Sequence, residues 1–325
     1  MMNNNQLTRN HNIVFLFSGQ GSHYRGMGSQ LFKNNITFSQ SLKDSDNYIK
    51  QRLGVSIIDE IYSNKNNHFD DLIITHPAIL AIELALLDVM NELEIHPHYV
   101  AGNSLGELAA AVAAGVWTKK EALEYAAEQA MFIVERNDEG GMIAIINQPL
   151  DKVKSMIAGK GLQVASRNLE NHCTIVGGVY DILQFQNELE ISNIQFSRLP
   201  VAYPFHSTLL NGYHVNSLDV PRQSVDSKRK FVSGLYCSEM TNLPDNYFWN
   251  VISLPMNFIQ FVTYMETLGP SIYIDLGPSG TNATFFKYNM PETTNSIAYQ
   301  IMTPFNKEMV QLNSLELMLN SNKRF

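Results

Sequence analysis

The first part of the chain alternates short, unbroken apolar runs with longer segments suited to helices. An apolar run predicts a buried strand at residues 13–17, and the stretch 96–101 ends in a short apolar run that suits a second one. The longer segments predict helices at residues 27–38, 38–52, 70–94 and 105–116. Strands that alternate with helices in this way favour a parallel sheet.

Two helix starts are indicated by their residues. The Thr-Lys-Lys-Glu sequence at residues 118–121 is a capping box, which predicts a helix from Thr118 to about Arg136. Within residues 70–94, Pro77 suits a first helical turn and Thr75 suits the cap before it. His76 lies between them, and a structural role is expected for it.

The pattern changes after the Asn-Asp-Glu-Gly-Gly sequence at residues 137–141. Strands are predicted at 142–146, 162–166, 173–177 and 194–199, and helices at 151–159 and 179–189. This order, βαββαβ, is the ferredoxin-like arrangement. We therefore predict an α/β fold in two parts. These are a large α/β-hydrolase-like domain with a parallel sheet, residues 1–139 and 200–325, and an inserted ferredoxin-like small subdomain, residues 140–199.

The last segment returns to the large domain. It predicts a strand at 230–237, a helix around Phe248 and Trp249, a helix at 257–268, a strand at 272–276 and a closing helix at 312–319. No internal repeat interrupts this order. The large domain is therefore expected to be completed by segments distant in sequence.

The composition of the 325-residue chain excludes several classes of protein. A net charge of −8 without a basic run argues against a nucleic-acid or anionic-membrane partner. Cys173 and Cys237 have neither metal-site spacing nor a disulfide framework, which predicts no metal and a reducing compartment. Residues 1–12 are polar without a signal peptide, and no apolar stretch approaches transmembrane length. We expect a soluble cytoplasmic protein.

Residues 102–107, Gly-Asn-Ser-Leu-Gly-Glu, contain Gly-x-Ser-x-Gly where a strand should end and a helix begin. In such a nucleophile elbow a serine stands on a sharp turn, and the two glycines let the backbone pass close by. The turn would place the Ser104 hydroxyl at a helix N-terminus, where free N–H groups favour a developing oxyanion. Ser104 is therefore a candidate nucleophile, although so short a pattern also arises by chance.

Four motifs follow one another in an order that resembles the malonyl-CoA–acyl carrier protein transacylase family. This family includes the acyltransferase domains of fatty-acid and polyketide synthases. The motifs are Phe-Ser-Gly-Gln-Gly-Ser at 17–22, the elbow at 102–107, Phe-His-Ser at 205–207 and Asp-Leu-Gly-Pro at 275–278. The resemblance covers roughly residues 13–304, with the small subdomain between the second and third motifs.

The resemblance implies a role for individual residues. Ser104 is the nucleophile and His206 its general base, since a serine hydroxyl needs an imidazole to take its proton. The backbone N–H groups of Gln20 and Leu105 form the oxyanion hole. In the family an amide oxygen or a backbone carbonyl orients the imidazole, and Asn257 stands at the matching position.

The resemblance also places three residues in the acyl pocket: Gln129, Asn168 and Phe205. Structural alternatives remain open for some of these assignments. His206 would have a merely structural role if the motif were accidental, although its family position favours catalysis. Asn257 suits a helix cap as well as it suits a histidine partner, and the glycines beside Gln20 would also serve to relieve backbone strain.

The chain departs from malonyl-loading relatives at one position. These carry an arginine about 25 residues past the serine, which pairs with the substrate carboxylate. Here that position is Gln129, and no arginine lies between Arg52 and Arg136. Arg136 is roughly 10 Å too far along the helix to replace it. A buried, unpaired malonyl carboxylate costs about 3–5 kcal/mol, so a preference for neutral acyl groups is expected.

Three functions are compatible with these residues. The chain is similar to a divergent, freestanding group found in polyketide pathways whose synthase modules lack built-in acyltransferases. That likeness implies an acyl hydrolase that clears stalled acyl groups from acyl carrier proteins through an acyl-serine intermediate, without a cofactor. The alternatives are a malonyl- or acyl-CoA:acyl carrier protein acyltransferase and a non-catalytic docking subunit for carrier proteins. In each case the phosphopantetheine arm belongs to the carrier protein.

Overall fold

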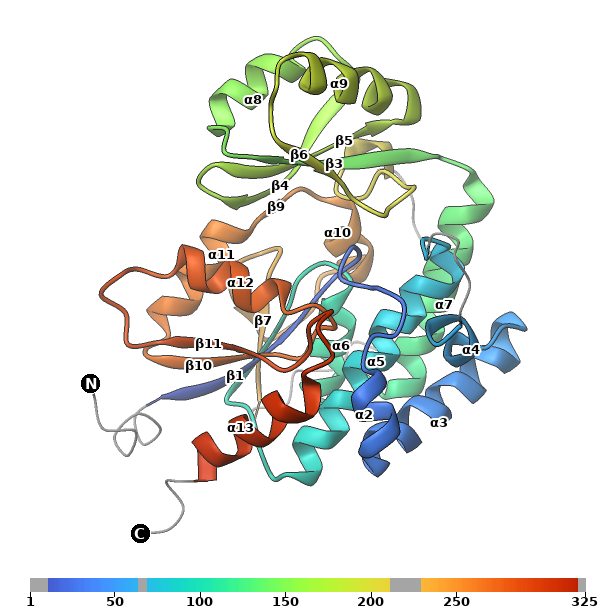
Figure 1. Cartoon of the computed structure of the whole chain (residues 1–325), viewed down its shortest axis with the longest axis vertical. Coiled ribbons are helices and arrows are strands. Elements are labelled where there is room, and N and C mark those ends of the chain that lie inside the picture. Colours follow the sequence, from blue (N-terminus) through green and yellow to red (C-terminus); the bar gives the residue numbers. More distant parts are fainter. Residues whose placement is uncertain (1–10, 64–68, 211–228, 321–325) are drawn as a thin grey trace.

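The structure is a computed structural model that describes residues 11–63, 69–210 and 229–320. The fold is mixed α/β, and the residues in these ranges form two sheets, one of six strands and one of five (Figure 1). The polar segment expected at residues 1–12 lies outside the described residues except for its last two positions. Cys173 and Cys237 are both free thiols.

The six-stranded sheet has the order β11-β10-β1-β2-β7-β8. All neighbouring pairs except β7 and β8 are parallel, as predicted for the large domain. The strand expected at 230–237 ends at Ser233, because the chain turns there and returns as the antiparallel edge strand β8. The strands are β1 (Asn12–Phe17), β2 (Tyr99–Gly102), β7 (Lys230–Ser233), β8 (Ser238–Met240), β10 (Ser271–Asp275) and β11 (Ile297–Gln300).

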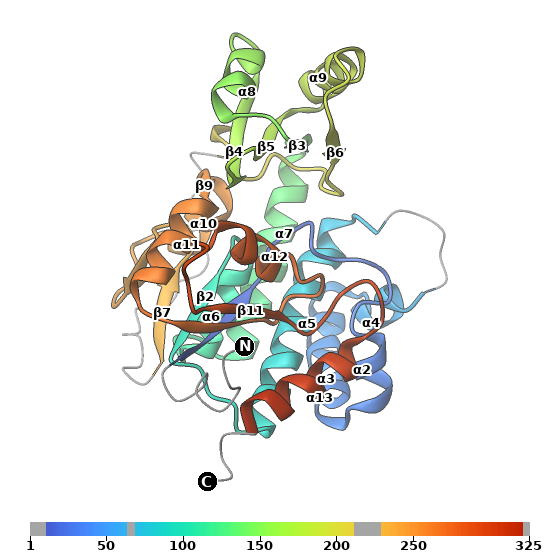
Figure 2. The ribbon, with the colours of Figure 1, turned by 60° about the vertical axis from the view of Figure 1, so that its left-hand side comes forward.

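Helices cover both faces of this sheet (Figure 2). Side chains alternate along β1, so Phe15 and Phe17 enter one apolar core while Val14 and Leu16 enter another. The first core contains residues of α2, α3, α5, α6 and α7, and the second contains residues of α11 and α12. The helices outside the second sheet are α2 (Ser29–Asn34), α3 (Ile36–Leu53), α4 (Ile57–Ile61), α5 (Leu72–Glu92), α6 (Gly106–Ala113), α7 (Lys119–Arg136), α10 (Tyr247–Ser253), α11 (Phe258–Thr267), α12 (Thr281–Asn289) and α13 (Glu308–Asn320).

Helix α5 corrects two of the sequence expectations. Its cap is the Asp71 side chain, which accepts from the Ile73 amide, so Thr75 and Pro77 lie inside the helix rather than at its start. By length and composition α5 would also be apolar enough to cross a membrane, contrary to the expectation that no stretch approaches that length. However, 83% of its most apolar 18-residue window is buried, as in the core helix of a soluble protein.

The second sheet has the order β6-β3-β5-β4-β9, and α8 and α9 lie on its outer face (Figure 1). The chain forms its first four strands and both helices in the order βαββαβ. The fifth strand, β9, comes from outside residues 140–199 and pairs in parallel with β4. The elements are β3 (Gly140–Ile146), α8 (Leu150–Ile157), β4 (Leu162–Leu169), β5 (His172–Gly178), α9 (Val179–Ile191), β6 (Phe196–Arg198) and β9 (Met256–Asn257).

Candidate active site

Ser104 lies on the turn between β2 and α6, as the elbow motif predicts. Its φ is 57°, a left-handed conformation that is rare for residues other than glycine. Gly106 is required here because a Cβ at this position would lie 2.3 Å from the Phe17 carbonyl oxygen of β1. The sharp turn therefore holds the serine against the carboxyl end of the neighbouring strand.

His206 is hydrogen-bonded to Ser104, with Nε2 2.8 Å from Oγ. Its Nδ1 lies 2.9 Å from the Leu254 carbonyl oxygen. A carbonyl only accepts, so Nδ1 carries the proton and Nε2 is left to accept from the serine hydroxyl. Burial lowers the pKa of His206 to about 4, although the Leu254 carbonyl acts in the opposite direction. The imidazole is therefore neutral and able to take a proton at neutral pH.

Asn257 does not orient this imidazole, contrary to the prediction from the resemblance. Its side chain caps α11 and accepts from the Gln260 amide at 3.2 Å. The Leu254 carbonyl takes the orienting role instead. Sequence reasoning could not identify Leu254, because a backbone carbonyl is common to every residue type.

The glycine-rich turn after β1 lies directly against the elbow. A Cβ on Gly19 would come within 2.9 Å of the Ser104 Cβ, so only glycine allows this approach. Among the described residues, neither the Gln20 nor the Leu105 backbone N–H donates to a backbone or side-chain acceptor. Both amides are therefore available for an oxyanion at Ser104.

Glu83 of α5 is hydrogen-bonded to the start of the glycine-rich turn, a contact that the sequence did not reveal. Its Oε1 accepts from the Ser18 amide at 2.6 Å and from the Ser18 hydroxyl at 3.0 Å. Burial raises the pKa of Glu83 well above its ordinary value. Glu107 has a similar role at the end of the elbow motif, where it accepts from the Leu235 amide at 3.0 Å and from the Tyr247 hydroxyl.

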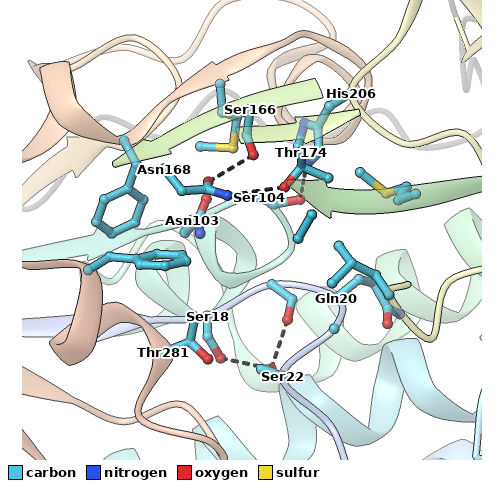
Figure 3. Close-up of a pocket in the computed structure, with 18 of the residues that line it drawn as sticks. Ser18, Gln20, Ser22, Asn103, Ser104, Ser166, Asn168, Thr174, His206 and Thr281 are labelled. Atoms are coloured by element: carbon cyan, nitrogen blue, oxygen red, sulfur yellow. Dashed lines mark hydrogen bonds between the residues drawn. The ribbon is translucent and has the colours of Figure 1, made fainter. Parts of the chain in front are cut away.

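A cavity of about 320 Å³ opens beside Ser104 and His206, between the two sheets (Figure 3). Asn168 and Phe205 line it, as predicted. Apolar side chains from β3 and polar side chains from β4 and β5 form much of the wall, and α12 contributes side chains of both kinds. Among its described lining residues, none is Lys, Arg, Asp or Glu.

Gln129 does not line this cavity, which corrects the prediction for the acyl pocket. Gln129 is 1% exposed, and Gln20 and His76 lie between its side chain and the cavity. Gln20 Nε2 lies 2.9 Å from His76 Nδ1, and His76 Nε2 lies 2.8 Å from Gln129 Oε1. The amide of Gln129 donates in turn to the Phe248 carbonyl at 3.0 Å. Of the three hydrogen-bonded side chains Gln20, His76 and Gln129, Gln20 lines the cavity.

The site and the fold together are those of an acyl transferase domain, a class of protein that transfers acyl groups. Residues 14–226 match the family model of the acyl transferase domain. The chain belongs to this family.

Relatives from polyketide pathways extend this result. The chain is 36% identical over 322 residues to the polyketide biosynthesis acyltransferase homolog PksD of Bacillus subtilis (strain 168), covering 97% of this chain and 99% of that protein. It is 34% identical over 317 residues to the homolog BaeD of Bacillus velezensis, covering 94% and 96%. The protein is therefore similar over its whole length to acyltransferase homologues of polyketide biosynthesis.

Solved structures of acyltransferases share the fold. The structure of MCAT from Streptococcus pneumoniae gives a TM-score of 0.74 at 22% identity, covering 94% of this chain and 99% of that one. A loading acyltransferase from the avermectin modular polyketide synthase gives 0.83 at 18% identity, covering 93% and 99%. At such identities the likeness shows the fold alone.

Proposed function

We propose that this protein is an acyl–acyl carrier protein thioester hydrolase that removes neutral acyl groups in polyketide biosynthesis. The observation that carries the preference for neutral acyl groups is the uncharged wall of the cavity beside Ser104. Its two histidines, His172 and His206, both have a pKa lowered by burial, so neither supplies a cation at neutral pH. The similarity to polyketide acyltransferase homologues supports an acyl carrier protein as the partner.

In the first half-reaction Ser104 Oγ attacks the thioester carbonyl carbon. His206 Nε2, 2.8 Å away, takes the hydroxyl proton as the bond forms. The Gln20 and Leu105 amides stabilise the oxyanion of the tetrahedral intermediate. Collapse of this intermediate breaks the C–S bond, and the proton on His206 passes to the leaving thiolate. The products are acyl-Ser104 and the free thiol of the carrier arm.

In the second half-reaction water takes the place of the thiol. His206 accepts a proton from the water as its oxygen attacks the acyl ester, and then returns that proton to Ser104 Oγ. The acid is released and the serine is restored. The proposed reaction uses no metal or cofactor of the protein. The phosphopantetheine arm that carries the acyl group belongs to the carrier protein.

The charge of the acyl group decides the proposed specificity. A malonyl carboxylate in this cavity would lose water without meeting a cation, at a cost of about 3–5 kcal/mol. An acetyl or longer alkyl group carries no such charge. We therefore propose a preference for neutral acyl groups by roughly two to four orders of magnitude in rate.

The second sheet supports the interpretation of residues 140–199 as an inserted ferredoxin-like subdomain. Its first four strands have the order β6-β3-β5-β4, and two helices pack on one face. We propose that this subdomain forms one wall of the acyl site, since side chains of β3, β4, β5 and β6 line the cavity beside Ser104.

An acyltransferase is the second candidate, and the family match itself favours it. Both candidates share the acyl-serine and differ only in whether water or a thiol resolves it. The intact Ser104–His206 pair argues against a docking subunit without catalysis. The test is to incubate the protein with acetyl-loaded carrier protein and a second, unloaded carrier protein. Free acetate as the main product supports the hydrolase, whereas acetylation of the second carrier protein supports the transferase.

A further inference from the structure

A second polar cluster lines the cavity on the side of the small sheet, and the proposed mechanism does not use it. It consists of Ser166 and Asn168 of β4 with His172 and Thr174 of β5 (Figure 3 labels all but His172). Thr174 is 4% exposed and Asn168 is 7% exposed. Polar groups at this depth are normally satisfied by one another or by a ligand.

The backbone of β4 places Asn168 in this cluster. Arg167 pairs with Cys173 and Leu169 pairs with His172, so Asn168 is the extra residue of a β-bulge. A bulge redirects a side chain out of the regular alternation and often stands beside a functional site. Helix α12 stabilises the bulge, because the Asn289 side chain donates to the Asn168 carbonyl at 2.8 Å.

The hydrogen bonds of Asn168 have a fixed direction. Its Oδ1 accepts from the Ser166 hydroxyl at 2.8 Å. Its Nδ2 lies 3.1 Å from His172 Nδ1 and 3.1 Å from Thr174 Oγ1. An amide nitrogen only donates, so both of these partners must accept.

The groups left over in the cluster are therefore donors. With Nδ1 accepting, the neutral His172 ring carries its proton on Nε2, and burial lowers the pKa of His172, which favours this neutral form. Thr174 Oγ1 accepts from Asn168 and keeps its own proton to donate. Among the described residues, neither donor has a hydrogen-bond acceptor.

We infer that Thr174 and His172 form a subsite that binds an acceptor oxygen of the thioester substrate, with Asn168 as the positioning residue. Two oxygens of such a substrate have this chemistry. One is a hydroxyl or keto oxygen on the acyl chain, and the other is an amide carbonyl of the pantetheine arm. The inference rests on the proposed function, because it takes a thioester as the ligand.

The test measures binding without turnover, in the Ser104→Ala variant. Three ligands are compared by their dissociation constants: S-ethyl butanethioate, the N-acetylcysteamine thioester of butanoic acid, and S-ethyl 3-hydroxybutanethioate. The second adds an acetamido group on the thiol side, and the third adds a hydroxyl on the acyl side. One added hydrogen bond should tighten binding about fivefold to tenfold.

The subsite variants show whether that gain comes from this cluster. Thr174→Val and His172→Phe should each remove most of the gain, whereas Thr174→Ser should keep it. Thr263→Val is the matched control, because this exposed threonine of α11 bonds only to the Ile259 carbonyl of its own helix. A gain for the hydroxyl ligand identifies the acyl oxygen, and a gain for the amide ligand identifies the arm.

Either of two results overturns the inference. The first is equal affinity for the three ligands, which includes the case in which none of them binds measurably. The second is a gain in affinity that persists in both Thr174→Val and His172→Phe. A failure of the proposed function would be seen separately. In that case the native protein would release no free acid from acyl-loaded carrier protein, or would pass the acyl group to a second carrier protein, while the pattern of dissociation constants would stand.

Discussion

His76 Nε2 donates to Gln129 Oε1 across 2.8 Å, inside the core and behind the wall of the active-site cavity. The direction of this bond follows from the far side of Gln129, whose amide nitrogen donates to the Phe248 carbonyl. Burial lowers the pKa of His76 to about 4, so the ring is neutral. The position at which malonyl-loading relatives are expected to hold a cation is thus part of an uncharged hydrogen-bonded chain that ends at Gln20.

The first prediction concerns that position. Gln129→Arg should place a guanidinium against the donor N–H of His76, with the loss of two hydrogen bonds. A buried, unpaired charge costs about 3–5 kcal/mol, so the free energy of unfolding should fall by a similar amount. Denaturant unfolding measures this loss, and Gln184→Arg on the exposed side of α9 is the matched control.

The same variant should leave the preference for acetyl over malonyl thioesters unchanged, because residue 129 does not line the cavity. The double variant His76→Ala/Gln129→Arg opens space between Gln129 and Gln20, and it should raise malonyl acylation of Ser104 relative to acetyl. If the single variant were stable and gained malonyl acylation, residue 129 would have direct access to the acyl group.

The second prediction concerns the nucleophile. Ser104→Ala should abolish the acyl-enzyme while the fold remains intact, since within the described ranges the hydroxyl bonds only to His206. Intact-mass spectrometry after incubation with an acetyl thioester measures the adduct, and thermal unfolding checks the fold. An acetyl adduct on the alanine variant would place the nucleophile elsewhere.

The third prediction concerns pH. His206 acts as a base only when neutral, and its pKa is lowered to about 4. The rate of Ser104 acylation should therefore rise with pH through about 4 and be level from there to neutral pH. His206→Ala should slow acylation by roughly 10²–10⁴ and remove this limb. An ascending limb centred near the ordinary histidine pKa of 6.5 would contradict the buried, desolvated imidazole.

The fourth prediction concerns Glu107. Burial raises its pKa from 4.5 to about 8, although the hydrogen-bond donors around the carboxyl group lower the pKa. Between these values the folded protein holds a proton that the unfolded chain has released, so the free energy of unfolding falls as pH rises. Glu107→Gln should reduce this fall between pH 5 and pH 8 by on the order of a few kcal/mol. Denaturant unfolding at both pH values measures it, with exposed Glu92→Gln as control; identical pH slopes for the native and Glu107→Gln proteins would refute it.

Much of the fold could be predicted from local sequence. Unbroken apolar runs gave the central strands β1 and β10, and the capping box at Thr118 is present in α7. Helix α12 and strand β11 were not anticipated, because they are short and half-buried and lack a clear periodic pattern. The prediction for the cap of α5 is wrong because proline is frequent in first turns, whereas here it lies inside a mostly buried helix.

The site was predictable where chemistry dictates a residue type. A nucleophile needs a serine and a base needs a histidine, and the structure brings Ser104 and His206 together across 102 positions of sequence. The Leu254 carbonyl and the Gln20–His76–Gln129 chain depend on long-range packing, which no local pattern encodes. Asn257 shows the same limit, since its cap and partner interpretations differ only in three dimensions.

The measurement that tests the central claim most directly is the rate of Ser104 acylation by matched acetyl- and malonyl-loaded carrier proteins. The uncharged cavity predicts that the acetyl-loaded protein acylates Ser104 about 10²–10⁴ times faster. The proposed hydrolase activity predicts free acetate as the product. Acylation by malonyl at an equal or higher rate would contradict the account, because a carboxylate would then be accepted without a cation to pair with it.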